Sequence, residues 1–318
     1  MTLEAMPAII KHWSFSRAAA LEECPRRYLL HYVVPRAPSD LVPESVQRNV
    51  LFLRQLKTLP MLLGTAVHQA ASRWLESCAQ GKPLPLKSLL DESWHFIERS
   101  VAFSAAEHYL YRDEQAPYYT VLMEHIYRIE ITDAYMGRLY RKLKAALRRL
   151  PAWPVQPVAG GMQGPRLVQS EVLSAVERDG LALWFKLDAL FQLESGQLLV
   201  VDWKLSEYNP QRDLLQLALY GTYVAEQVAG PGREVVLANY YLSNGKLVRH
   251  RFTSKLAAAV AGYVARSVQQ MARLEETFFS GKGLAAQPPE WKAGLCTRCP
   301  FRKLCFPASG KPAVNPDC

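Results

Sequence analysis

The sequence predicts a mixed α/β fold, in which a helical first half leads into a central sheet flanked by further helices. Two observations support this prediction. Apolar residues recur with helical spacing up to residue 150, and after a Pro/Gly-rich connector at residues 151–165 they follow the period of strands. Beyond the connector, strands alternate with helices, which is typical of a sheet covered by helices.

The first half is expected to hold several helices separated by loops. Ser14 or Ser16 can cap the first of them, which Cys24-Pro25 interrupts. Residues 33–60 are richer in proline and read as a loop with at most one short helix. Further helices are expected over residues 62–78 and 87–150, and the second range holds two or three of them.

The second half is expected to be rich in strands. Asp179-Gly180 and Ser195-Gly196 are turn sequences that join three strands into an antiparallel meander, and Asn244-Gly245 joins a separate hairpin. The expected strands cover residues 167–178, 181–193, 197–204, 234–243 and 246–252. The expected helices cover residues 211–228 and 254–280.

The composition is that of a globular protein with a basic balance. Of 318 residues, 49% are apolar and 21% are charged, and the net charge of +9 favours a polyanionic partner such as nucleic acid. We find no run of about 18 apolar residues and no secretory signal, so we expect a cytoplasmic protein that does not enter a membrane. In a reducing compartment, clustered cysteines bind metal more often than they form disulfides.

The segment from residue 124 to residue 150 is dense in Arg, Lys and Tyr and ends in RKLKAALRRL. Most of these cations are expected to form an ordinary solvated helix face. The alternative is that a subset faces DNA, because phosphate contacts need only Lys or Arg on a presented surface.

The two turns of the meander predict which carboxylates meet. A two-residue loop at the Asp-Gly turn places Glu171 opposite Asp188. An odd loop at the Ser-Gly turn places Asp188 opposite Asp202, whereas an even loop would place Trp203 there and break the site. Lys204 follows Asp202 by two residues and therefore points to the same face of the strand. Three acids and a lysine are thus predicted on one face of one sheet.

Carboxylates that lie so close together repel one another unless a cation sits between them. Oxygen ligands with open water positions suit Mg²⁺ or Mn²⁺. The alternative is that each acid is an edge-of-sheet residue paired with a nearby Lys or Arg. The mutually consistent positions of three acids and a lysine favour the metal site.

Four motifs follow one another along the chain: GTAVH ending at His68, WFKLDAL around Asp188, the triplet from Asp202 to Lys204, and QLALY from Gln216. In this order they resemble the PD-(D/E)XK nuclease superfamily, and within it the RecB-like branch. That branch includes nuclease domains of bacterial recombination helicase-nucleases and the CRISPR-associated nuclease of spacer acquisition. The resemblance implies a restriction-endonuclease-like core with a central mixed sheet.

The resemblance also implies a set of metal ligands. His68, Asp188 and Asp202 would bind the metal, and the Trp203 carbonyl would be a further ligand. Glu171 is added to the catalytic residues, not to the ligands, from the strand register alone. The bound metal would lower the pKa of a water and neutralise charge on the phosphate.

Lys204 would orient or activate the attacking water and stabilise charge at the scissile phosphate, and Gln216 and Tyr220 would contact DNA or support the site. We therefore expect a metal-dependent DNA nuclease for single-stranded or end-bearing DNA, in repair, recombination, or CRISPR- or phage-related processing. The alternatives are a DNA-binding subunit that cuts nothing and a zinc-clasped interaction module. No Gly-Lys pair is followed by Ser or Thr, so the sequence has no phosphate-binding loop of the kind that helicases use. Any unwinding of DNA would therefore require a partner such as a helicase or another recombination or CRISPR protein.

Three of the six cysteines, Cys296, Cys299 and Cys305, follow a C-x2-C-x5-C spacing. This spacing supplies three ligands to one metal centre, and thiolate softness alone leaves zinc and an iron–sulfur cluster open. The resemblance to the RecB-like branch implies a 4Fe-4S cluster, with Cys24 as the distant fourth ligand. Such a cluster would act as a clasp that joins the N- and C-terminal segments.

The chain is accordingly expected to have four parts. Residues 1–60 carry the first cluster cysteine, residues 61–165 form a helical region with the motif histidine, residues 166–280 form the nuclease core, and residues 281–318 carry the remaining cluster cysteines.

Overall fold

A six-stranded mixed sheet forms the centre of the computed structural model, which describes residues 10–107, 120–155, 157, 164–206, 209–230 and 232–307. The strand order is β1-β3-β4-β5-β6, and β2 pairs with β3. The β1–β3 and β4–β5 pairs are parallel and the others are antiparallel. The predicted mixed α/β fold is confirmed. The strands are β1 (His12–Ser14), β2 (Arg166–Arg178), β3 (Leu181–Gln192), β4 (Leu198–Lys204), β5 (Val235–Tyr241) and β6 (Lys246–Arg251).

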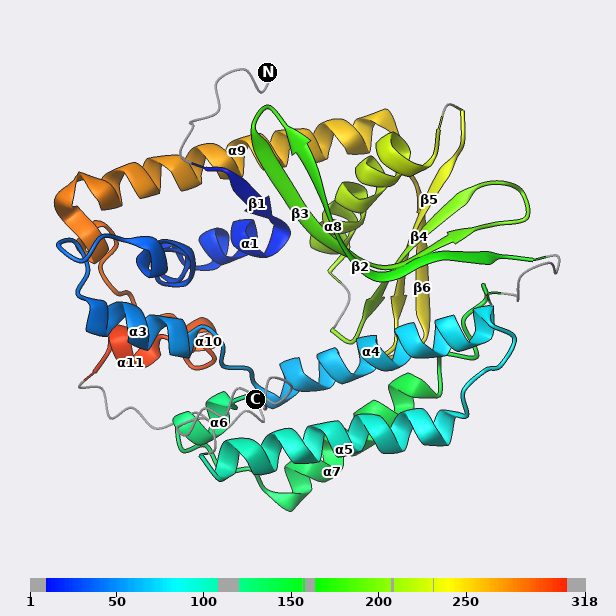
Figure 1. The fold of residues 1–318 in the computed structure, drawn as a ribbon, viewed down its shortest axis with the longest axis horizontal. Coiled ribbons are helices and arrows are strands. Elements are labelled where there is room, and N and C mark those ends of the chain that lie inside the picture. Colours follow the sequence, from blue (N-terminus) through cyan, green and yellow to red (C-terminus); the bar gives the residue numbers. More distant parts are fainter. Residues whose placement is uncertain are drawn as a thin grey trace.

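Helices cover both faces of the sheet (Figure 1). α8 (Pro210–Tyr223) and α9 (Ser254–Thr277) pack on one face, and α4 (Leu59–Ala79) packs on the other, with α5 (Leu86–Ala105) and α7 (Asp133–Leu147) beyond it. Successive residues of β4 alternate between the two faces, as expected for a strand that is buried on both sides. Leu198 and Val200 belong to the core under α8 and α9, while Leu199 and Val201 belong to the core under α4 and α7.

The turn between β2 and β3 has the geometry that the sequence predicts. Asp179 and Gly180 have φ angles of +51° and +76°, and positive φ at both central residues is the pattern of a two-residue type I′ loop. The register of the β2–β3 pair is the same on both sides of Glu171 and places it opposite Asp188. The first predicted carboxylate pair is therefore confirmed as an opposed pair.

The loop between β3 and β4 has an odd number of residues, as the predicted site requires. The Leu193 N–H donates to the Gln197 carbonyl at 2.8 Å and closes a three-residue loop, in which Gly196 has a φ of +81°. This is the loop type whose last residue is left-handed, a conformation that favours glycine. The β3–β4 register continues toward Asp188 and Asp202 as opposed residues, although the ladder ends one pair before them.

Residues 24–53, close to the N-terminus, lie beside residues 283–307, close to the C-terminus (Figure 1). The Arg26 guanidinium donates to the carbonyls of Leu284 (2.7 Å) and Gln287 (2.6 Å), and the ring of His31 lies edge-on to Phe301 at 6.0 Å. These protein contacts join the two segments. The elements are α1 (Phe15–Glu23), α2 (Pro25–Tyr28), a π-helix (Leu29–Val33), a 3-10 turn (Val34–Arg36), α3 (Glu44–Leu53), α6 (Met123–Ile126), a second π-helix (Val224–Val228), a third (Phe278–Lys282), a 3-10 turn (Gly283–Ala286), α10 (Ala293–Cys296) and α11 (Arg302–Cys305).

Strand β1 was not predicted from the sequence. It has three residues, too few to show a strand period, and its pairing with β3 is a tertiary contact. Trp13 fixes it in place, because its buried indole N–H donates to the Ser267 hydroxyl of α9 at 2.8 Å.

The division into four parts stays a prediction. In the portion of the chain that the structure describes, no helix is long and apolar enough to cross a membrane.

Candidate active site

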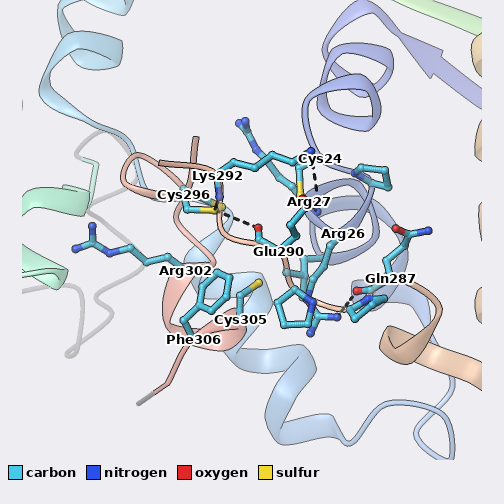
Figure 2. A pocket seen from close by; sticks show the side chains of 15 residues that line it. Cys24, Arg26, Arg27, Gln287, Glu290, Lys292, Cys296, Arg302, Cys305 and Phe306 are labelled. Atoms are coloured by element: carbon cyan, nitrogen blue, oxygen red, sulfur yellow. Dashed lines mark hydrogen bonds and ion pairs between the residues drawn. The ribbon is translucent and has the colours of Figure 1, made fainter. Parts of the chain in front are cut away.

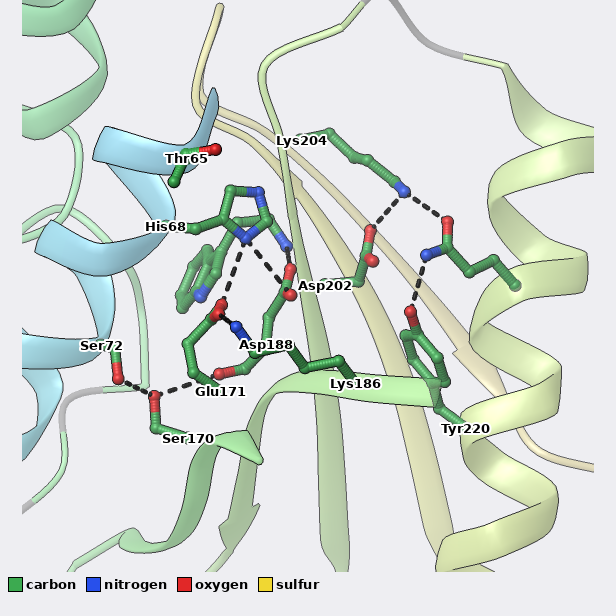
Figure 3. A network of polar contacts seen from close by, with 12 residues as sticks. Thr65, His68, Ser72, Ser170, Glu171, Lys186, Asp188, Asp202, Lys204 and Tyr220 are labelled. Atoms are coloured by element: carbon green, nitrogen blue, oxygen red, sulfur yellow. Dashed lines mark hydrogen bonds and ion pairs between the residues drawn. The ribbon is translucent and has the colours of Figure 1, made fainter. Parts of the chain in front are cut away.

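Three metal-ligating side chains converge where α4 crosses the β2–β3 pair. Nδ1 of His68 lies 3.3 Å from Oε1 of Glu171 and 3.3 Å from Oδ1 of Asp188 (Figure 3). Within the described ranges, only these three His, Cys, Asp or Glu residues offer ligand atoms that all lie within 4.8 Å of one another. One cation can reach all three, since metal–ligand distances of about 2.1 Å place neighbouring ligand atoms about 3 Å apart.

The local sequence explains how His68 reaches the sheet. The Thr58 hydroxyl accepts from the Met61 N–H at 3.4 Å and caps the start of α4. The buried face of the helix carries small side chains at Ala66 and Ala70 next to His68, and small residues let a helix approach its neighbour closely. The histidine is thereby presented at the sheet surface.

Glu171 has an unusual backbone conformation. Its φ is +54°, in the left-handed region that few non-glycine residues adopt and where strain clusters at functional sites. The neighbouring Ser170 hydroxyl contacts the Ser72 hydroxyl of α4 (2.7 Å) and the Asp188 carbonyl (3.2 Å), which locks the strand there. Lys186 forms an ion pair with the Glu171 carboxylate. Strand β2 is therefore held at this point by α4 and β3 together.

The electrostatics of this group fit a bound cation. Burial disfavours the charged form of His68, but the carboxylates of Asp188 and Glu171 outweigh it and raise the histidine pKa to about 10. Burial also acts to raise the pKa of Glu171, but His68 and Lys186 outweigh it and the net pKa is lowered. Two carboxylates and an imidazole at this spacing are a donor set that suits a divalent cation.

Asp202, near the end of β4, lies outside this group of three. Its Oδ2 forms an ion pair with Lys204 Nζ at 2.8 Å and accepts from the Asn239 amide at 3.0 Å. Burial and the nearby charge of Asp188 raise the Asp202 pKa to about 6, although Lys204 acts against them. The prediction that Asp202 shares a face with Asp188 agrees with this electrostatic contact, but Asp202 is not one of the three clustered ligands.

A hydrogen-bonded chain holds Lys204 from the side of α8. Lys204 Nζ donates to Gln216 Oε1 at 2.7 Å, and Gln216 Nε2 donates to the Tyr220 hydroxyl at 2.6 Å (Figure 3). Burial, with the charge of Asp202, raises the pKa of Tyr220 well above its usual range. The structure thus places Gln216 and Tyr220 as supports of the lysine.

Trp203 connects the two halves of the site through its backbone. Its N–H donates to Oδ2 of Asp188 at 2.7 Å, so one carboxylate oxygen is fixed by β4 while the other faces His68. The indole is buried on the opposite face, against Trp153 and Tyr240. The Trp203 carbonyl as a metal ligand stays a prediction.

Three further residues of the site were not predicted from the sequence. Asp213 is buried, accepts from the Tyr241 hydroxyl (2.5 Å) and lies 3.9 Å from Lys204 Nζ. The sequence could have identified Asp213, because it shares a helix face with Gln216, which follows it by three residues. Lys186 could have been identified as well, because it precedes Asp188 by two residues on β3. Asn239 could not, since its position depends on the β4–β5 pairing.

Two hollows flank the site. The first, which we call the α4 hollow, has a volume of about 390 Å³ and is lined by residues of α4 and α5 and by Glu171. The second, the α8 hollow, has a volume of about 780 Å³ and is lined by residues of the β1–α1 junction, β3 and α8, and by Lys204. Lys186, the ion-pair partner of Glu171, lines both hollows.

The four predicted cluster cysteines line one pocket between the chain ends, with a volume of about 60 Å³ (Figure 2). In the described part of the chain, no three of their sulfur atoms lie within 4.8 Å of one another. Cys24 Sγ accepts from the Arg27 N–H at 3.4 Å and Cys296 Sγ from the Lys292 N–H at 3.3 Å. Burial raises the pKa of the Cys299 thiol to about 11. The pocket is also lined by the cations Arg26, Arg27, Lys292 and Arg302.

The comparison with known protein families agrees with this geometry. A family model described as the PD-(D/E)XK nuclease superfamily matches residues 12–306. The structure of the "Putative exonuclease" from Eubacterium rectale is similar at 10% identity and a TM-score of 0.41, over 84% of this chain and 82% of that one. The structure of SSO0001 is similar at 13% identity and a TM-score of 0.28, over 65% and 80%. No curated protein matches the chain.

Proposed function

The chain belongs to the PD-(D/E)XK nuclease superfamily, and from that premise we propose that it is a deoxyribonuclease that depends on Mg²⁺ or Mn²⁺. The observation that carries the proposal is the group formed by His68, Glu171 and Asp188, with ligand atoms within 4.8 Å of one another. A nuclease fold implies a nucleic acid substrate, and the net charge of +9 supports a polyanionic one.

The metal would be held by His68, Glu171 and Asp188, with Asp202 and the Trp203 carbonyl as further ligands. Both contacts of Asp202 in the described part of the chain fall on Oδ2, which leaves Oδ1 for this role. When bound, the metal supplies an acidic water and offsets charge on the phosphate. An imidazole beside carboxylates suits Mn²⁺ at least as well as Mg²⁺.

Lys204 would stabilise the negative charge that develops on the scissile phosphate and orient the attacking water. Its ammonium is held between Asp202 (2.8 Å) and Gln216 (2.7 Å), so it keeps one position without reorganisation during the reaction. Tyr220 stays protonated in its buried setting and fixes the Gln216 amide.

We assign the substrate as single-stranded or end-bearing DNA and the setting as repair, recombination, or CRISPR- or phage-related processing, with a helicase or similar protein as partner. The resemblance of the four motifs to the RecB-like branch supports this assignment. The alternative is a DNA-binding subunit that cuts nothing, and the full set of acids and Lys204 at the site disfavours it.

The direct test is digestion of end-labelled DNA by the purified chain in Mg²⁺ or Mn²⁺. We expect wild-type protein to cut and Asp202→Asn to lose at least about 10²-fold in rate while it still binds DNA, because the carboxylate charge at the site is lost. Equal cutting by both proteins would refute the assigned site. Tight DNA binding without cutting by the wild type would favour the non-cleaving alternative.

We also propose that Cys24, Cys296, Cys299 and Cys305 hold a 4Fe-4S cluster that clasps the chain ends. Their shared pocket supports this, as do the cations that line it and offset the charge of a thiolate-bound cluster. A tetrahedral zinc would place sulfur atoms about 3.8 Å apart. The cavity that the four thiols line is several times the size of one water, which leaves room for a group larger than a single ion.

Metal analysis after anaerobic purification tests the cluster. We expect about four iron atoms and four sulfides for each chain, a brown colour, and loss of both in Cys299→Ser, because three thiolates hold such a cluster poorly. Cys78→Ser is the matched control and should keep its iron, since Cys78 lies on α4 away from this pocket. One zinc and no iron in colourless protein would show the zinc-clasped alternative instead.

A further inference from the structure

The α8 hollow has a lining that metal-dependent hydrolysis does not require. Besides Lys204 and Tyr220 it presents three further aromatic side chains, Phe15, Trp184 and Phe185. Its volume of about 780 Å³ lies within the range of about 300–1,000 Å³ that is typical of ligand sites. The hollow therefore has the size and the apolar surface to hold an organic group next to the reacting centre.

Two of these aromatic rings are placed to receive a flat ligand. Trp184 is 39% exposed, one of few large apolar side chains in the described chain that reach solvent to this extent. Phe15 packs against Tyr263 at 5.9 Å, and the Arg212 guanidinium lies 5.9 Å from its centroid. Phe185 is buried and packs against Tyr223 at 4.7 Å, so it forms the floor.

The charges around the hollow are mostly positive. Lys186, Lys204 and Arg212 line it together with a single acid, Asp213. That acid is buried and already accepts from the Tyr241 hydroxyl and from a backbone N–H. The complementary ligand is thus one that combines a flat ring with negative charge, which is the chemistry of a nucleotide.

We propose that the α8 hollow holds an unpaired nucleotide next to the phosphodiester bond that is cut, with its base against Trp184 and Phe15 and its phosphate near Arg212. The inference rests on the proposed function and specifies its substrate as a single strand or a frayed end. In a duplex both faces of a base are covered by its neighbours, so only an unpaired base can stack on a protein ring.

Binding of single strands in excess chelator tests this site without cleavage. Fluorescence anisotropy would compare a labelled oligonucleotide with one of equal length whose positions are all abasic, which keeps the phosphates and removes the bases. We expect Trp184→Ala to weaken binding of the normal strand by roughly 5- to 100-fold, and to leave binding of the abasic strand unchanged. Trp184→Phe should retain most of the wild-type affinity for the normal strand.

Leu173→Ala is the matched control, because Leu173 is 62% exposed on the neighbouring strand β2 and does not line the hollow. It should bind both strands as the wild type does. The inference is overturned if Trp184→Ala binds the normal strand like the wild type, or if it weakens both strands equally. A chain that shows the Trp184 effect but never cuts DNA in Mg²⁺ or Mn²⁺ would refute the nuclease proposal and leave this site standing.

Discussion

Lys204→Met is expected to slow phosphodiester hydrolysis by about 10²- to 10³-fold, the usual cost of removing one donor that stabilises transition-state charge. The ammonium is fixed by Asp202 and Gln216, so no other group takes its place. Methionine keeps most of the volume and the unbranched shape of lysine, so the hollow is not reshaped. DNA binding should change only a few-fold, because a single phosphate contact contributes little to total affinity.

The measurement is the single-turnover rate on end-labelled DNA at saturating metal, with DNA affinity measured in parallel. Lys255→Met, at an exposed position on α9, removes the same charge far from the site and should cut at the wild-type rate. If Lys204→Met and Lys255→Met cut equally fast, Lys204 has no role in the chemical step.

Glu275→Ala is expected to lower the free energy of unfolding by about 3–5 kcal/mol, the range found when one partner of a buried ion pair is removed. Glu275 is fully buried on α9, where it accepts from the Tyr28 hydroxyl at 2.6 Å and pairs with Arg36. Arg17 lies 3.7 Å away. The substitution leaves two guanidinium groups and a hydroxyl without their shared acceptor, and it loosens the N-terminal segment from α9.

Urea unfolding of the two proteins at equal metal content measures this loss. The neighbouring Glu276→Ala is the control, because Glu276 is exposed and its substitution should change stability by less than about 0.5 kcal/mol. Equal unfolding midpoints for wild type and Glu275→Ala would show that this buried network does not stabilise the fold.

The carboxylate register could be predicted from the sequence because it depends on local turn chemistry. Asp179-Gly180 dictates a two-residue loop, and Gly196 supplies the left-handed residue of a three-residue loop. Once loop length is known, the opposed residues follow by counting, and this brought Glu171 to Asp188 without any motif. The bounds of the strands and long helices followed from periodicity for the same local reason.

Features that depend on tertiary contacts could not be predicted in this way. Strand β1 is too short to show a period, and the parallel β4–β5 pairing that sets Asn239 beside Asp202 involves segments far apart in sequence. The sequence also did not predict that the group of three would lie without Asp202, and the β3–β4 ladder ends one pair before it. Asp213 could have been predicted in part, because its place on the same helix face as Gln216 follows from helical periodicity. Its contact with Tyr241 is tertiary and could not be predicted.

The central claim is that the group of His68, Glu171 and Asp188 binds the divalent metal on which DNA hydrolysis depends. Mn²⁺ titration, with free Mn²⁺ followed by electron paramagnetic resonance and cutting of labelled DNA followed in the same samples, tests it most directly. The account predicts that Mn²⁺ binding and cutting rise together in the wild type and are both lost in Asp188→Asn. Mn²⁺ binding by Asp188→Asn at wild-type affinity, or full cutting in excess chelator, would contradict it.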